Sequence, residues 1–134
     1  MRFLTKYEIL LLNKNNISTF GGNFVPPNNL LNESNLDYLI EAVQALLFGN
    51  PMYPNIHDKA GVYLFNIICN HIFTDGNKRT GLDACILFLD YNHYQLSNSV
   101  TNEILTNFIL GLASGEQTLE QVQFWIKSNA TKVV

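Results

Sequence analysis

The chain has 134 residues, which is enough to bury a hydrophobic core without the support of a disulfide or a metal ion. Hydrophobic residues make up 47% of the sequence, and this excludes a disordered tail or linker. The net charge of −3 provides no basic surface for nucleic acid, so we expect no direct nucleic-acid partner.

Three helices are predicted in the first half of the chain. Residues 5–8 have the form of a capping box and start a short helix, which the asparagines of residues 13–16 are expected to end. Residues 34–37 start a second helix with apolar residues at helical spacing, and Gly-Asn-Pro at residues 49–51 stops it. A third helix with an apolar face is expected at about residues 57–70.

Three more helices are predicted in the second half. The fourth starts near Asn77 or Lys78 and ends at residues 92–93, and the last two span about residues 101–113 and 119–129. We find no convincing series of strands and no repeat. The sequence therefore predicts one all-α domain over residues 1–134, a compact bundle of about six helices.

No part of the sequence has the features of a membrane or export segment. The apolar runs are shorter than the roughly 20 residues of a membrane span, and Glu41 interrupts the best of them. The first residues lack the basic and apolar segments of a secretion signal. The two cysteines, Cys69 and Cys85, are expected to be reduced thiols in the core. We therefore predict a cytoplasmic protein with no membrane partner.

The segment that joins the third and fourth helices is unusually polar for a connection between two apolar helices. A helix that starts just after Gly76 offers unpaired backbone N–H groups and a positive dipole end, both of which favour an anion. Asn77 can donate to a phosphate oxygen and also cap the helix. Lys78 adds a point charge, and Arg79 adds a planar fork that can bind two phosphate oxygens. The pattern predicts a phosphate-binding site.

Three other residues of this segment complete the predicted site. His71 can take a proton near neutral pH and so activate an attacking hydroxyl. Asp75 can hold Mg²⁺ beside nucleotide phosphates. Phe73 is expected to anchor the loop in the core. Each type also has a plainer interpretation, since a histidine at a helix end is commonly a cap and Asp-Gly is commonly a turn.

Residues 71–80 read His-x-Phe-x-Asp-Gly-Asn-Lys-Arg-Thr, which resembles the signature of the Doc (death-on-curing) toxins, a branch of the Fic family. Residues 16–22 near the N-terminus, 84–92 and 113–116 are also similar to that family. The resemblance covers most of the chain and implies a small, nearly all-helical domain with the active loop between two central helices.

The sequence departs from the general Fic pattern at three positions. Ile72 replaces a proline, Lys78 replaces a glycine, and Leu82 replaces the final arginine, which helps to hold the nucleotide in Fic nucleotidyltransferases. The lysine-containing loop is the Doc form. It implies an ATP- and Mg²⁺-dependent kinase that binds ATP in the reverse sense, with His71 as the base and Asp75 as the metal ligand.

The resemblance also implies a target and a partner. The target is a threonine of elongation factor Tu, whose phosphorylation stops translation, and the partner is a Phd-like antitoxin with a disordered C-terminal segment. Two alternatives remain open: a Fic-type nucleotidyltransferase that adds AMP to a protein hydroxyl, and a catalytically silent binding module of the same fold.

Overall fold

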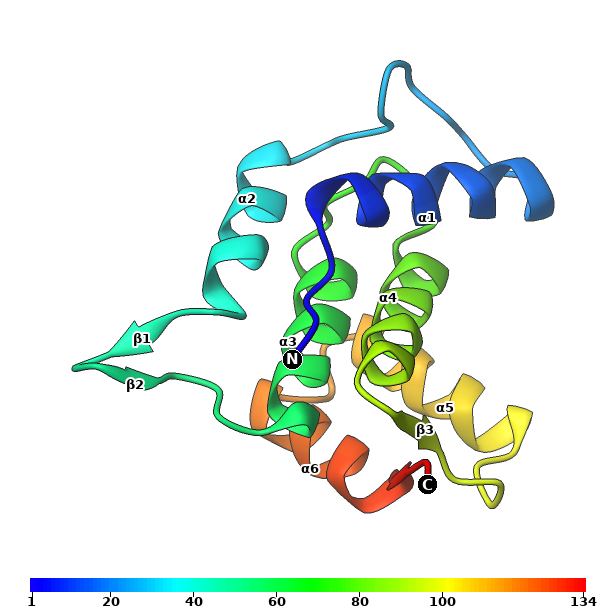
Figure 1. Ribbon diagram of the computed structural model, residues 1–134. Coiled ribbons are helices and arrows are strands. Elements are labelled where there is room, and N and C mark those ends of the chain that lie inside the picture. The colour runs from blue at the N-terminus through cyan, green and yellow to red at the C-terminus, as the bar shows by residue number, and fades with distance from the viewer.

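The computed structural model describes residues 1–134 and contains six α-helices with two short β-ribbons (Figure 1). The predicted all-α fold is confirmed. No helix combines the length and the apolar character that a membrane span requires. The helices are α1 (Lys6–Phe20), α2 (Glu33–Ala42), α3 (Ile56–Cys69), α4 (Asn77–Tyr91), α5 (Asn102–Ala113) and α6 (Leu119–Asn129). The antiparallel ribbons pair β1 (Leu46–Leu47) with β2 (Asn50–Pro51) and β3 (Tyr94–Leu96) with β4 (Ala130–Lys132).

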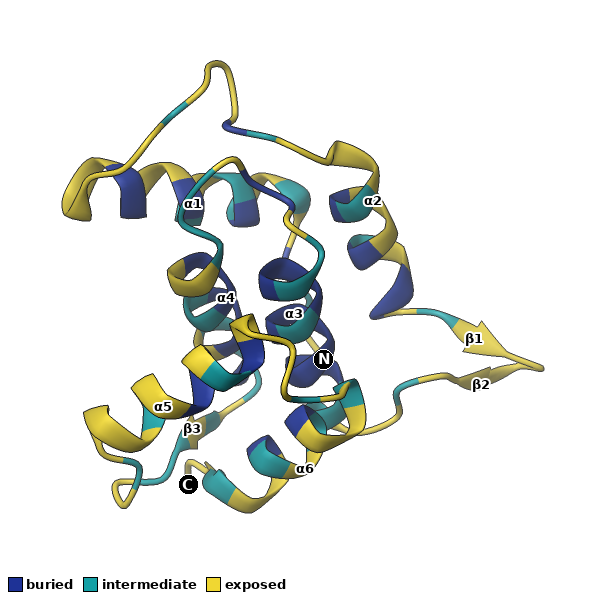
Figure 2. Cartoon of the chain, turned by 180° about the vertical axis from the view of Figure 1, so that it is seen from behind, coloured by how far each residue is buried: buried dark blue, intermediate teal, exposed yellow.

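Helix α3 is the centre of the bundle. Nine of its 14 residues are buried, and it packs against α4 on one side and α6 on another (Figures 1 and 2). Tyr63 and Phe88 are fully buried where α3 meets α4, and their ring centroids are 5.1 Å apart. Helix α1 lies across the end of this pair where the chain turns from α3 into α4 (Figure 1).

Gly81 lets α3 and α4 approach closely. A Cβ at this position would lie 2.7 Å from Cγ1 of Ile68 on α3, which is closer than real Cβ contacts. Glycine lowers helix stability by about 1 kcal/mol relative to alanine. Close helix packing therefore explains why a glycine stands in the middle of α4.

The end of the first helix was predicted wrongly. Helix α1 continues through residues 13–16 and ends at Gly21, which has a φ of 87°. Asn13 and Asn16 lie on its buried face together with Ile9 and Ile17, at the spacing of one helical stripe. Because these asparagines are polar, a search for apolar periodicity reads them as the end of the helix.

The second helix and the stretch after it also differ from the prediction. Helix α2 starts at Glu33 after Asn32 and ends at Ala42, so residues 34–37 do not cap it. Leu46 and Leu47 belong to a hairpin whose turn residues, Phe48 and Gly49, have φ values of 51° and 82°. Positive φ at both turn residues is characteristic of a type I′ turn. The hairpin projects from the body of the protein, and Phe48 at its tip is 97% exposed (Figure 1).

Candidate functional site

The loop between α3 and α4 is held in place by the segment just before α2. The backbone N–H groups of Leu31 and Asn32 both donate to Ile72 O, at 2.8 and 3.1 Å. Thr74 N donates to Asn29 O at 2.8 Å. A connecting segment about 40 residues earlier in the chain therefore pairs with the polar loop and fixes its path.

His71 follows Asn70, the C-cap of α3, at the start of this loop. Its φ of 47° places it in the left-handed region, which a non-glycine residue adopts at a cost of order 1–3 kcal/mol. Its carbonyl accepts a hydrogen bond from Asn32 Nδ2 at 3.0 Å, whereas its exposed imidazole makes no hydrogen bond. The backbone of His71 is thus fixed while its ring remains free to accept a proton from an approaching hydroxyl.

Phe73 is fully buried, which is where an anchor for the loop must lie. The side-chain amide of Asn77 closes a ring with its backbone: Phe73 N donates to Asn77 Oδ1 at 2.9 Å, and Asn77 Nδ2 donates to Phe73 O at 2.8 Å. The helix N-cap is Gly76, without a side-chain cap, so Asn77 does not cap α4 as expected. Its amide is occupied, and the group it can offer a phosphate is its backbone N–H.

The start of α4 is the part of the site that suits an anion. The backbone N–H groups of Asn77, Lys78 and Arg79 have no hydrogen-bond partner in the structure. Such orphan donors and the positive end of the helix dipole both attract an anion. The Lys78 ammonium is exposed and forms no salt bridge, so its charge is available to a ligand.

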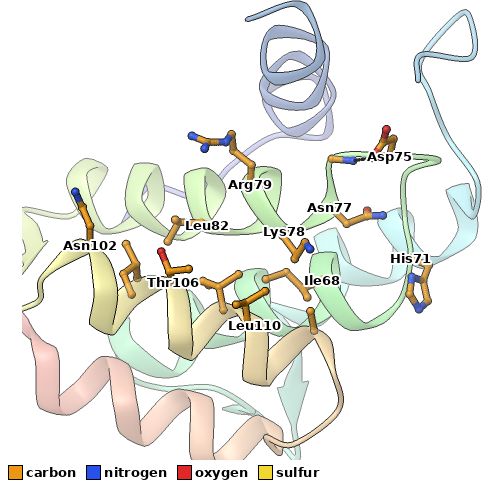
Figure 3. Close-up of a pocket in the computed structure, with 14 residues that line it drawn as sticks. Ile68, His71, Asp75, Asn77, Lys78, Arg79, Leu82, Asn102, Thr106 and Leu110 are labelled. Carbon is orange, nitrogen blue, oxygen red and sulfur yellow. Dashed lines mark hydrogen bonds between the residues drawn. The ribbon is translucent and has the colours of Figure 1, made fainter. Parts of the chain in front are cut away.

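His71 and the residues at the start of α4 line one cleft of about 850 Å³ (Figure 3). Most of the predicted site residues meet here, and only the anchor Phe73 lies beneath them in the core. Lys78 projects toward the space between α4 and α5, whereas Asp75 and Arg79 leave the start of α4 on the opposite side (Figure 3). The wall that faces the loop comes from α5, which the sequence did not connect with the site. The loop and the first turn of α4 contribute His71, Asp75, Gly76, Asn77, Lys78 and Arg79 to the cleft, and the α5 residues include Asn102, Leu105, Thr106 and Ile109.

The carboxylate of Asp75 is bound by backbone N–H groups. Asn23 N donates to Oδ2 at 2.9 Å, and Gly76 N donates to Oδ1 at 2.8 Å. These two bonds, together with the nearby charge of Lys78, lower the pKa of Asp75. A side chain at position 22 would prevent the approach of Asn23, because a Cβ on Gly22 would lie 2.8 Å from Oδ2. Asp75 is therefore ionised at neutral pH, as a metal ligand must be.

The guanidinium of Arg79 stacks on the ring of Phe20, the last residue of α1, with 3.9 Å between its central carbon and the ring centroid. Asp83, one turn further along α4, does not pair with Arg79, because its Oδ2 accepts from Asn16 Nδ2 at 2.9 Å. Arg79 stands at the rim of the cleft and would have to leave Phe20 to grip a phosphate bidentately.

Comparison with known protein families agrees with this arrangement. The model of the Fic/DOC family matches residues 3–89. The chain is 30% identical over 122 residues to the protein kinase doc of Escherichia phage P1, and the match covers 91% of this chain and 90% of that protein. The chain belongs to the Fic/DOC family.

A second relative is more similar over a shorter stretch. The chain is 40% identical over 62 residues to the toxin Doc of Mycolicibacterium smegmatis, and the match covers 46% of this chain and 48% of that protein.

The structure places the three residues that depart from the general Fic pattern. Ile72 is fully buried, and Lys78 and Leu82 line the cleft. Two of the three differences therefore change the surface that a ligand would meet.

Three site residues were missed because their signal is weak in the sequence. Asn13 and Asn29 are fully buried and form hydrogen bonds beneath the loop, and Gly22 admits Asn23 to Asp75. The spacing of Asn13 from Ile9 and Ile17 was a usable signal for the first of them, since four residues return to the same helix face. Nothing in the local sequence marks Asn29.

Proposed function

We propose that this protein is a Doc-like toxin that transfers the γ-phosphate of ATP to a threonine hydroxyl of elongation factor Tu and so halts translation. One observation carries the proposal: the unpaired N–H groups at the start of α4, the free Lys78 ammonium and the free imidazole of His71 lie on one cleft. The names of the relatives support it, since one is a protein kinase and the other a toxin.

The residues of the cleft suit phosphoryl transfer, which needs positioning and charge stabilisation more than covalent chemistry. The N–H groups of residues 77–79 and the Lys78 ammonium would bind the phosphates. His71 would accept the proton of the threonine hydroxyl as its oxygen attacks the γ-phosphorus, and ADP would leave. Arg79 would add charge at the rim after it leaves Phe20.

Asp75 is the residue that would hold Mg²⁺. No group of three histidine, cysteine, aspartate or glutamate side chains in the chain could hold a metal ion by itself. Mg²⁺ suits such a site, because it takes one or two carboxylates and completes its coordination with nucleotide phosphates and water. When bound, it would neutralise phosphate charge during transfer.

Lys78 and Leu82 favour transfer of a phosphate over transfer of a nucleotide. A cation at position 78 fills space and adds a phosphate partner where the general Fic pattern has glycine. Leu82 offers no charge one turn further along α4, where the pattern has the arginine that helps to hold the nucleotide. Both residues line the cleft, so both would contact a triphosphate bound there.

A toxin of this kind would be controlled by an antitoxin. We propose a Phd-like partner whose disordered C-terminal segment folds on the toxin, a mode in which an amphipathic helix fills an apolar groove. The basis is the family resemblance and the relative named as a toxin.

The test is intact-mass spectrometry of purified bacterial elongation factor Tu after incubation with this protein, ATP and Mg²⁺. His71→Ala removes the proposed base. His93→Ala is the matched control, because His93 is also an exposed histidine with positive φ (66°) that follows a helix, but it lies outside the cleft. Any loss of stability from placing alanine at a position with positive φ should therefore occur in both variants.

We expect a gain of one phosphate with the wild type and His93→Ala, and none with His71→Ala. A mass gain the size of a nucleotide would show that the protein is a nucleotidyltransferase instead of a kinase. An unmodified elongation factor would refute this target, and the same assay on other translation factors would then follow.

A further inference from the structure

We propose that Asn13, on α1, is a positioning residue for the phosphate-binding end of α4. Its buried amide holds the backbone of Asp75 and the first turn of α4 so that the unpaired N–H groups converge on one ligand. The role in phosphate binding rests on the proposed function, whereas the contacts of Asn13 are observed in the structure.

The amide of Asn13 has no contact with solvent and uses both of its ends. Nδ2 donates to Asp75 O at 2.9 Å and to Thr80 Oγ1 at 3.1 Å. Oδ1 accepts from Asn29 Nδ2 at 3.0 Å. A polar side chain that is fully buried and fully bonded fixes its partners strongly, because leaving any one of them unpaired is costly.

The partners of Asn13 bracket the anion-binding segment. Asp75 O comes directly before Gly76, the left-handed N-cap of α4, and Thr80 lies just after the three residues with unpaired N–H groups. A Cβ on Gly76 would lie 3.2 Å from Asn13 Nδ2, so the loop passes directly against this amide. Helix α4 has no side-chain cap of its own, and Asn13 on α1 bonds the residues on both sides of the unpaired N–H groups.

Asn29 extends the same network to the segment that pairs with the loop. Its Nδ2 is 3.4 Å from Asp75 O, in addition to its bond to Asn13, and its carbonyl accepts from Thr74 N. Its Oδ1 accepts from Val25 N at 2.9 Å. Asn13 therefore joins α1, the segment before α2 and the loop at one buried point, directly beneath the residues that meet the ligand.

The test compares Asn13→Asp with Asn16→Ala. Asp keeps the size of the side chain but replaces the donor with an acceptor that faces Asp75 O, so the loop must move. Asn16 is the matched control: it is buried on the same helix and also bonds α4, through Asp83, but it forms no hydrogen bond with the loop. Asn13→Ala removes the amide without adding charge and replaces Asn13→Asp if that variant does not fold.

Two measurements separate positioning from general stability. Hydrogen exchange of the free protein follows the amides of Gly76 and Thr80, which donate to Asp75 Oδ1 and Gly76 O. Steady-state kinetics give KM for ATP and kcat for transfer to elongation factor Tu. For Asn13→Asp we expect exchange at these two amides to rise about tenfold relative to the rest of α4, and KM for ATP to rise about tenfold as well. Asn16→Ala should leave both within about twofold.

Equal exchange and equal KM in the two variants would overturn the inference and leave Asn13 as a packing residue. The exchange experiment needs no substrate. If the wild type transferred nothing to the elongation factor, the proposed function would fail, while local exchange at Gly76 and Thr80 would still decide whether Asn13 positions the loop.

Discussion

The close crossing of α3 and α4 makes Gly81→Ala a sharp test of the packing described above. Alanine should gain about 1 kcal/mol of helix stability relative to glycine. Its Cβ, however, would lie 2.7 Å from Cγ1 and 3.3 Å from Cδ1 of the buried Ile68, and 3.4 Å from Leu64 O. Isoleucine is stiff at χ1 and cannot swing aside, so the overpacking cost should be about 1–3 kcal/mol.

The two effects oppose each other, and the overpacking should win. We expect Gly81→Ala to lower the free energy of unfolding by about 1 kcal/mol, which corresponds to roughly 2–5 °C in Tm for a domain of this size. Gly111→Ala on α5 is the control, because its Cβ would meet only the ends of flexible side chains, the nearest being Glu116 Oε2 at 3.2 Å. Gly111→Ala should keep most of the helix stability that alanine adds relative to glycine, so this variant should be at least as stable as the wild type.

Urea unfolding of both variants, and of Gly81→Ala combined with Ile68→Ala, measures these quantities. Without the Ile68 side chain the clash disappears, so Gly81→Ala should stabilise the Ile68→Ala background by up to about 1 kcal/mol. If Gly81→Ala stabilised the wild type as much as Gly111→Ala does, the close approach of α3 and α4 would be refuted.

Four further predictions concern the loop and the thiols. Asp75→Asn should raise the Mg²⁺ concentration needed for transfer, and an unchanged Mg²⁺ titration would remove Asp75 from the metal site. Lys78→Gly should abolish phosphoryl transfer while circular dichroism stays unchanged; retained kinase activity would contradict the proposed orientation of ATP. The hydrogen bond from Asn23 N–H lowers the pKa of Asp75, so this contact should stabilise the fold fully above about pH 4, the ordinary aspartate pKa. The stabilisation should be lost as the pH falls through the lowered pKa of Asp75. An NMR titration of the Asn23 amide would follow this loss. Burial raises the pKa of Cys85 to about 12 and that of Cys69 less strongly, so iodoacetamide at neutral pH should modify Cys69 slowly and Cys85 only in the unfolded protein, as peptide mass mapping would show.

The helices whose signals are local were predictable. Helix α6 begins and ends where its capping box and apolar spacing place it, and α4 begins directly after the Asp-Gly turn. The error at the end of α1 arose because tertiary contacts outweigh the local pattern there. Residues 13–16 look like a helix end because they are polar, yet two of them are buried against α4 and its preceding loop.

The prediction that the second helix continues to about residue 48 was wrong for a different reason. Residues 46 and 47 continue the apolar spacing of the helix, and a single sequence does not show that no other element packs over them. Once exposed, they gain nothing from helical spacing. The chain instead turns at Phe48 and Gly49, where both residues adopt positive φ.

The sequence by itself determined which residues form the candidate site, because the residues from His71 to Arg79 are contiguous and their types suit anion binding and proton transfer. Only the tertiary structure decided what each side chain does there. The Asn77 amide is used on Phe73, Arg79 lies on Phe20, and the loop is held by Asn13 and Asn29 from distant parts of the chain. Hydrogen bonds depend on distance and direction between groups far apart in sequence, and those are fixed only when the helices pack.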